Sequence, residues 1–164
     1  CLSTDAADKD RKARDEARKK SACASTQQQP QFTASELPTL LKQGESNPIW
    51  DLLGDKCLSC GSCVLVCPSC FCFDVRDDVD LNLTDGNRFR QWDGCVLEDF
   101  AKVATGENFR KARVDRYRHR FYRKGQYLFE KFGTPACVGC GRCVKACLAD
   151  IANPVRVYNA LKEG

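Results

Sequence analysis

The N-terminal part of the chain is patterned almost entirely by polar positions. Residues 5–20, DAADKDRKARDEARKK, place acidic residues four positions before basic ones and carry almost no apolar stripe, which predicts an exposed helix. Residues 21–35 form a polar linker that contains Pro30. Residues 36–53 return to apolar positions and predict two short helices, broken at GESNP, which pack against the cysteine-rich stretch that follows.

The stretch VDLNLTDGNRFRQW is expected to form a β-hairpin. Val79, Leu81 and Leu83 alternate with polar residues, as they do in a strand with one buried face. Asp85-Gly86 is a strong turn dipeptide and would connect the two strands.

Helical spacing of apolar residues returns in the C-terminal half. It predicts helices over residues 96–105 and 107–131, and a short helix over 150–161 that Asn153-Pro154 would interrupt. No run of 18 apolar residues occurs, so no membrane span is expected.

Cysteine changes this picture, because ten of the 13 cysteines lie in two stretches, CLSCGSCVLVCPSCFC and CVGCGRCVKAC. Both contain the pattern C-x2-C-x2-C-x3-C, which is the spacing of bacterial two-cluster ferredoxins. A disulfide scaffold would spread an even number of cysteines through the chain, so metal ligation in a reducing cytoplasm is favoured. Two zinc sites are the alternative, but tetrahedral zinc does not need so many thiols on one loop.

In this motif the first three cysteines of a loop bind one 4Fe–4S cluster, and the fourth reaches the other cluster. Two 4Fe–4S clusters are therefore expected. The first would be held by Cys57, Cys60, Cys63 and Cys147. The second would be held by Cys137, Cys140, Cys143 and Cys67.

Three further cysteines, Cys70, Cys72 and Cys95, leave two interpretations open. They would form a third metal or cluster site completed by another ligand, or they are small buried apolar residues beside the second cluster. The second interpretation is favoured, because three thiols do not close a tetrahedral site. Cys23 stands alone in the linker and is expected to have no role in metal binding.

The fold expected from the repeat is α+β. A two-cluster ferredoxin-like core over residues 57–164 would be opened by a long, mainly helical insertion at 73–136. A charged helix and linker at 1–35 and a short helical lead-in at 36–56 would precede it. The apolar share of 43% includes the 13 cysteines, so a protein without its clusters is expected to be largely unfolded.

Four segments together carry a resemblance to a known family. NPIWDLLGDKCLSCGSCVLVCPSCFC, RFRQWDGC, RYRHRF and CVGCGRCVKAC occur in that order between residues 46 and 151. They resemble the beta subunit of cytoplasmic nickel–iron sulfhydrogenases, and they are similar to the related iron–sulfur subunit of anaerobic sulfite reductases.

The resemblance implies an electron-transfer subunit with two 4Fe–4S clusters, not a catalytic one. Its expected partners are a flavin-containing, NAD(P)H-binding subunit and a terminal hydrogenase or reductase subunit. Members of the family carry a further domain upstream of the first cysteine loop. The chain has no Met and opens on Cys1, so we expect it to be part of a longer polypeptide.

The basic segment 110–124, RKARVDRYRHRFYRK, suggests a second function. Arg and Lys interleaved with aromatic residues are typical of nucleic-acid binders, which makes a nucleic-acid-associated iron–sulfur protein the alternative. No reader motif accompanies the segment, so a docking face or a positive field near the clusters is favoured. His119, the only histidine, is expected to be a hydrogen-bonding group on the helix surface. No Gly-rich phosphate loop is present.

Overall fold

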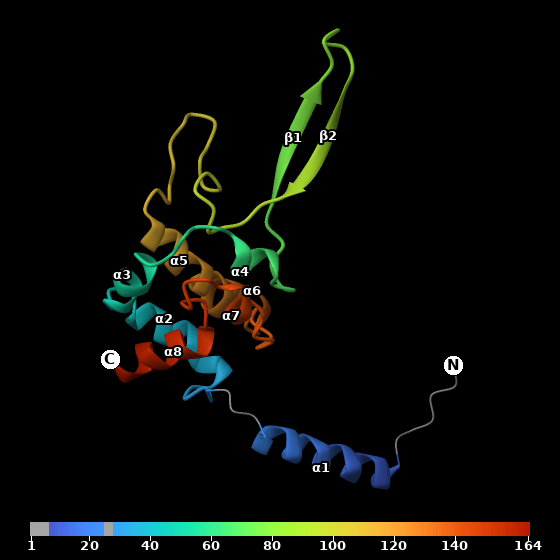
Figure 1. Ribbon diagram of the computed structural model, residues 1–164, viewed down its shortest axis with the longest axis vertical. Helices are drawn as coiled ribbons and strands as arrows, with labels where there is room; N and C mark the ends of the chain where they lie inside the picture. Colours follow the sequence, from blue (N-terminus) through green and yellow to red (C-terminus); the bar gives the residue numbers. More distant parts are fainter. Residues whose placement is uncertain (1–6, 25–27) are drawn as a thin grey trace.

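The computed structural model describes residues 7–24 and 28–164, without the side chains of residues 22–24. Helices form a body from which a two-stranded hairpin projects (Figure 1). The elements, in chain order, are α1 (Asp8–Ala24), η1 (Ala34–Glu36), α2 (Leu37–Gln43), α3 (Ile49–Gly54), α4 (Ser62–Leu65), β1 (Phe73–Val79), β2 (Gly86–Trp92), α5 (Arg113–Tyr122), η2 (Arg123–Tyr127), α6 (Leu128–Phe132), α7 (Arg142–Ala146) and α8 (Pro154–Glu163).

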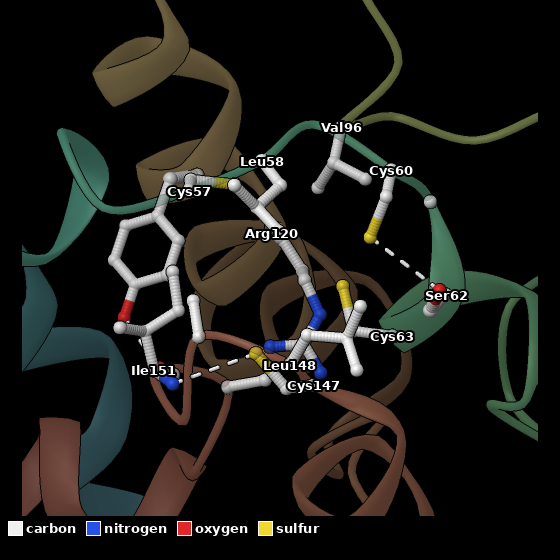
Figure 2. Close-up of a pocket in the computed structure, with 14 residues that line it drawn as sticks. Cys57, Leu58, Cys60, Ser62, Cys63, Val96, Arg120, Cys147, Leu148 and Ile151 are labelled. Carbon is white, nitrogen blue, oxygen red and sulfur yellow. Dashed lines mark hydrogen bonds between the residues drawn. The ribbon is translucent and has the colours of Figure 1, made fainter.

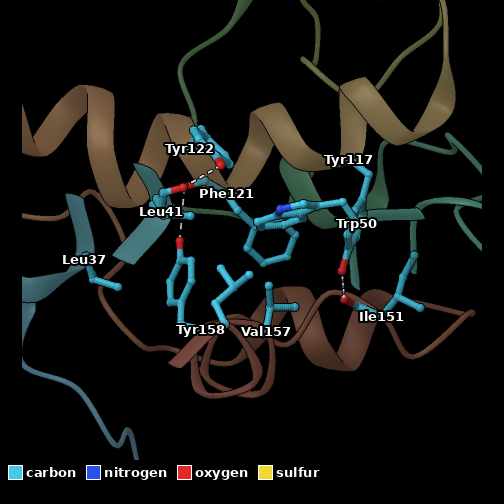
Figure 3. Close-up of a cluster of buried hydrophobic side chains, with 10 residues drawn as sticks. Leu37, Leu41, Trp50, Tyr117, Phe121, Tyr122, Ile151, Val157 and Tyr158 are labelled. Atoms are coloured by element: carbon cyan, nitrogen blue, oxygen red, sulfur yellow. Dashed lines mark hydrogen bonds between the residues drawn. The ribbon is translucent and has the colours of Figure 1, made fainter. Parts of the chain in front are cut away.

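An aromatic core holds α2, α3, α5 and α8 together (Figure 3). Trp50 of α3 packs against three rings of α5, and its indole nitrogen donates to the carbonyl of Gly44 at 2.7 Å. The ten buried members are Leu37, Leu41, Trp50, Tyr117, Phe121, Tyr122, Ile151, Val157, Tyr158 and Leu161. The lead-in at 36–56 therefore shares one core with α5 and α8.

Every buried tyrosine of this core has a partner for its hydroxyl group, as buried polar groups require. Tyr117 donates to the carbonyl of Ile151 and Tyr122 to that of Leu41, both at 2.7 Å, and Tyr158 donates to the carbonyl of Phe121 at 3.1 Å. These bonds tie α5 to α2 and α8 across the core.

Helix α5 continues through the π-helical η2 into α6, so one nearly continuous helix crosses the body. Its predicted start at 107 is wrong, because the helix begins at Arg113. Gly125 lies in the π segment, where an added Cβ would stand 2.7 Å from Leu41 Cδ1 and 3.0 Å from the Tyr158 hydroxyl. The absence of a side chain there lets α2 and α8 approach this helix.

The hairpin is confirmed, but its register differs from the prediction. The strands pair antiparallel from Phe73 opposite Trp92 to Val79 opposite Gly86. Gly86 is thus a strand residue, and Leu81 and Leu83 lie exposed in the connecting loop. The side chain of Asn82 accepts hydrogen bonds from the amides of Thr84 and Asp85 and stabilises that loop.

No helix forms over 96–105, although apolar spacing predicts one there. The segment consists of turns, and its polar groups pair across the loop: Val103 N donates to the carbonyl of Glu107, Phe109 N to that of Ala101, and the Asn108 side chain to that of Glu98. The insertion at 73–136 is therefore a hairpin, an irregular loop and a helix, and not mainly helical.

At the two ends of the chain the helices differ in setting. Pro154 is the first residue of α8, and Asn153 caps it by accepting from the amides of Val155 and Arg156, so this pair starts the helix instead of interrupting it. Helix α1 is exposed over residues 8–21 and lies apart from the body in Figure 1. None of the helices in the described ranges has the length and apolar character needed to span a membrane.

Candidate functional site

The two cysteine loops have left-handed residues at equivalent positions. Ser59 and Gly139, which precede the second cysteine of each loop, have φ angles of 51° and 66°. Gly61 and Gly141, which follow it, have φ angles of 77° and 71° and cap the short helices α4 and α7. Alternating left-handed residues turn successive amides toward one side of a loop, which makes a concavity suited to an anionic group.

The first loop and the last cysteine of the second loop line one pocket (Figure 2). Its thiols are those of Cys57, Cys60, Cys63 and Cys147. The amide of Ile151 donates to Cys147 Sγ at 3.5 Å, and Cys60 Sγ pairs with the Ser62 hydroxyl at 3.4 Å. Most of the remaining lining is apolar.

A second pocket has the reciprocal composition. Its thiols are those of Cys67, Cys137, Cys140 and Cys143. The fourth cysteine of each loop thus lies with the first three cysteines of the other loop, as the motif requires. Helices α4 and α7 pack against each other and bring the two loops together.

The donor set of each pocket fits a 4Fe–4S cluster, since four thiols and left-handed loop amides surround a mostly apolar space. A single metal ion would need three or four ligand side chains grouped around one point. Among the described residues, no three His, Cys, Asp or Glu side chains form a group that could hold one. The geometry therefore favours clusters over the zinc alternative in both pockets.

One buried cation connects the two pockets. Arg120 of α5 is only 3% exposed and lines both, and it reaches into the middle of the first in Figure 2. Burial acts to lower the pKa of Arg120, but the thiolates of Cys63 and Cys143 outweigh it and raise that pKa. A buried guanidinium requires negative charge nearby, which two anionic clusters would supply.

Other arginines of α5 also face the cysteine loops. Arg113 donates to the carbonyl of Cys57 at 3.2 Å, and Arg116 donates to the Ser59 hydroxyl at 3.2 Å. Arg116 and Arg120 are buried, so they are not available to a nucleic acid. The arginine face of the basic segment is turned toward the candidate clusters, which supports the positive-field interpretation.

The electrostatics of individual thiols follow from burial and hydrogen bonding. Burial raises the pKa of the Cys63 thiol to about 11, with Arg120 acting in the opposite direction. A hydrogen bond from Cys70 lowers the pKa of Cys67 to about 3, and Ser69 and Lys124 act in the same direction. These groups favour a thiolate at Cys67, which is the form that binds iron.

Beside the second pocket, the structure brings together the three remaining cysteines of the cluster region. Cys70, Cys72 and Cys95 line a third pocket with Arg120, Arg123 and Lys124. Cys95 is 3% exposed, whereas Cys70 and Cys72 are partly exposed. Cys23 falls outside the side chains that the structure describes.

The sequence predicted a positive field from the arginine face of residues 110–124, but it did not identify Arg120 and Lys124 as the cations that point inward. Their signal was present, because Arg113, Arg116, Arg120 and Arg123 recur at helical spacing, but spacing alone does not say which face is buried. His119 is half-buried, and its pKa is lowered to about 4 by burial and by Arg110 and Arg123.

Comparison with known proteins gives two matches. Residues 56–151 match the family described as 4Fe-4S dicluster domain. Over 128 residues the chain is 38% identical to sulfhydrogenase 2 subunit beta of Pyrococcus furiosus, which confirms the predicted resemblance. That match covers 78% of this chain but 37% of the relative, so the chain spans little more than a third of the relative's length. No solved structure matches the chain significantly.

Proposed function

Because the chain belongs to the 4Fe-4S dicluster domain family, we propose that it relays electrons through two clusters within a sulfhydrogenase-like complex. The observation that carries this proposal is the pair of pockets, each lined by three cysteines of one loop and the fourth cysteine of the other. The first cluster is assigned to Cys57, Cys60, Cys63 and Cys147. The second is assigned to Cys137, Cys140, Cys143 and Cys67.

A 4Fe–4S cluster takes up or releases one electron at a time. The residues of this chain hold the clusters side by side and set their electrostatic surroundings. Arg120 lines both pockets, and the buried Cys143 and the half-buried Cys63 keep water from part of each site. A positive charge and amide donors favour the reduced, more negative state, so these groups set the potentials at which both clusters work.

The proposed donor or acceptor pair consists of a flavin-containing, NAD(P)H-binding subunit and a terminal hydrogenase or reductase subunit. The support is that the matched relative is named as the beta subunit of a sulfhydrogenase. Two adjacent one-electron centres suit a partner that delivers electrons in pairs. Substrate chemistry would take place in the partners, and a cytoplasmic setting suits the free thiols of this chain.

Iron and acid-labile sulfide content of anaerobically purified protein tests the proposal, together with EPR spectra after dithionite reduction. We expect at least about eight irons per chain, four for each cluster, and the broadened signal of two interacting spins. Addition of NAD(P)H should reduce the clusters only when a flavin-containing subunit is present. Zinc in place of iron would refute the relay, and so would clusters that the flavin-containing subunit fails to reduce with NAD(P)H.

A further inference from the structure

Three cysteines outside the two four-thiol pockets converge at the root of the hairpin. The chain leaves the body through Cys70 and Cys72 and returns through Cys95, and Asp93 N donates to the carbonyl of Cys72 at 3.2 Å to close the root. Gly94 makes the return segment possible, because a Cβ there would stand 2.6 Å from Val64 Cγ2. Cys95 is thereby buried against Val64, with Cys70 and Cys72 packed beside it.

These thiols are close to one another and to the second pocket. Cys70 and Cys72 pack against the buried group that contains Cys95, and Cys70 is also the neighbour that most strongly lowers the pKa of Cys67, which is assigned to the second cluster. The third pocket shares Arg120 and Lys124 with the second. The two sites are therefore immediate neighbours.

Basic side chains line this pocket. Cysteines that served only as small buried apolar residues would not require positive charge beside them. Lys124 Nζ donates to the Ser69 hydroxyl at 2.9 Å, and the Arg123 guanidinium stacks over the Phe71 ring at 4.9 Å. Arg120 reaches the pocket as a side chain that is 3% exposed, and its Nε has no hydrogen-bond partner. No carboxylate is among the described residues that line the pocket, so negative charge near its three positive side chains has to come from thiolates or from a group that they hold.

The third pocket has the same ingredients as the first two, namely thiols, basic side chains and partly apolar walls. No three of the described thiols, carboxylates and imidazoles are placed to hold a single metal ion, and this applies equally to the two four-thiol pockets. A mononuclear zinc site is therefore disfavoured in all three places. An iron–sulfur cluster fits this set of side chains, because thiolates bind its iron and the cluster carries negative charge.

We propose that Cys70, Cys72 and Cys95 hold a third iron–sulfur cluster, a four-iron cluster with three protein thiolates and one iron open to an exchangeable ligand. The site itself does not depend on the proposed function. Only its role as an extension of the electron-transfer path rests on the two-cluster relay. Phe71, 53% exposed, and Trp92, 71% exposed, flank the site at the hairpin root. The third cluster thus lies next to the second and close to the surface, where electrons would pass to or from another protein of the complex.

Iron analysis of the anaerobically purified full chain decides the matter, beside the triple variant Cys70→Ala/Cys72→Ala/Cys95→Ala and the control Cys23→Ala. We expect about 12 irons in the parent protein and in the control, and about eight in the triple variant. Mild oxidation with ferricyanide should remove the iron that lacks a thiolate and produce the EPR signal of a three-iron cluster. That signal should be absent from the triple variant.

About eight irons in the parent protein, with no three-iron signal, would overturn the third cluster and leave the two-cluster relay intact. If thiol titration then found a Cys72–Cys95 disulfide, the pocket would hold a dithiol pair and not a cluster. Fewer than about eight irons, with zinc present, would instead refute the relay itself. The count on the parent protein keeps the proposal open to refutation even if the triple variant fails to fold.

Discussion

Arg120 places one buried positive charge beside all of the thiol pockets. It lines all three thiol pockets, and among the described residues it pairs with thiols and not with a carboxylate. A buried guanidinium without an anion would cost several kcal/mol. Its retention in the interior therefore makes physical sense only if the pockets carry negative charge, which clusters with thiolate ligands provide.

Removing the charge of Arg120 should shift the midpoint potentials of the clusters and not merely reduce the stability of the fold. We expect Arg120→Gln to lower the midpoint potentials of both assigned clusters by about 40–90 mV, because removing a nearby positive charge costs the reduced state about 1–2 kcal/mol. Potentiometric titration followed by EPR measures this shift. Arg120→Lys, which keeps the charge, should recover part of it.

Arg118→Gln is the matched control for that experiment. Arg118 lies on the same helix, α5, but binds Asp115 and the carbonyl of Glu45 and does not line any of the thiol pockets. Its replacement should leave both potentials within error. Loss of iron in Arg120→Gln without any shift in the remaining clusters would show that Arg120 has only a structural role.

His119 makes the stability of the protein depend on pH. Burial and the neighbouring Arg110 and Arg123 lower its pKa from 6.5 to about 4, so the folded chain keeps it neutral where the unfolded chain binds a proton. Stability is thus lost as the pH falls from about 6.5 toward 4. Because the side chain is partly exposed, we expect a loss on the order of 1 kcal/mol between pH 7 and about 5.

The measurement is the denaturant midpoint of unfolding of the anaerobic protein at these two pH values, compared with His119→Gln. The variant lacks the titrating group, so its stability should fall less over the same range. Equal pH dependence in the two proteins would rule out this contribution from His119.

At the level of elements, the helix formed by α5, η2 and α6 is the scaffold of the molecule. It carries aromatic residues toward the core on one face and basic residues toward the thiol pockets on the other. The π turn at Arg123–Tyr127 lies where the helix passes α2 and α8, at the side-chain-free position Gly125. Packing at this crossing therefore determines how the aromatic face is oriented toward the core and the basic face toward the thiol pockets.

Gly125→Ala should disturb this crossing. The new methyl group would meet Leu41 Cδ1 at 2.7 Å, which is closer than carbon atoms pack, so the buried Leu41 side chain or helix α2 has to shift. Overpacking of this kind costs about 1–3 kcal/mol, and thermal melting of the anaerobic protein should record it. Lys131→Ala, at an exposed position of α6, should change stability by no more than about 0.5 kcal/mol. A melting temperature of Gly125→Ala equal to that of the parent would contradict the close approach.

Two elements show where sequence patterns reach their limit. Leu81 and Leu83 alternate like strand residues, yet they lie in the loop of the hairpin. Strand pairing ends at Val79 opposite Gly86, and Asp80 N donates to the carbonyl of Asp85 to close the loop. Residues 96–105 have helical spacing, but cross-loop hydrogen bonds replace the helical ones. In both places, contacts made by the whole loop override local periodicity.

For the whole molecule, the spacing of cysteines along the sequence was more informative about the candidate sites than the hydrophobic pattern was about the fold. Both thiol pockets follow from C-x2-C-x2-C-x3-C, because the rule that the fourth cysteine crosses over applies whatever lies between the loops. The aromatic core was not foreseen, since composition alone suggested few core residues. Its members come from α2, α3, α5 and α8, and only tertiary packing brings these helices together.

The crossed arrangement makes a prediction that separates it from two self-contained loops. Under crossed ligation, Cys60→Ala and Cys147→Ala remove the same cluster, so the double variant should lose about four irons, no more than either single variant. Cys60→Ala/Cys67→Ala, by contrast, should lose both clusters and about eight irons. Iron content and EPR of the reduced variants measure the losses, with Cys23→Ala as control. If each loop bound its own cluster, the two double variants would exchange results, because Cys60 and Cys67 would then serve one cluster and Cys147 the other.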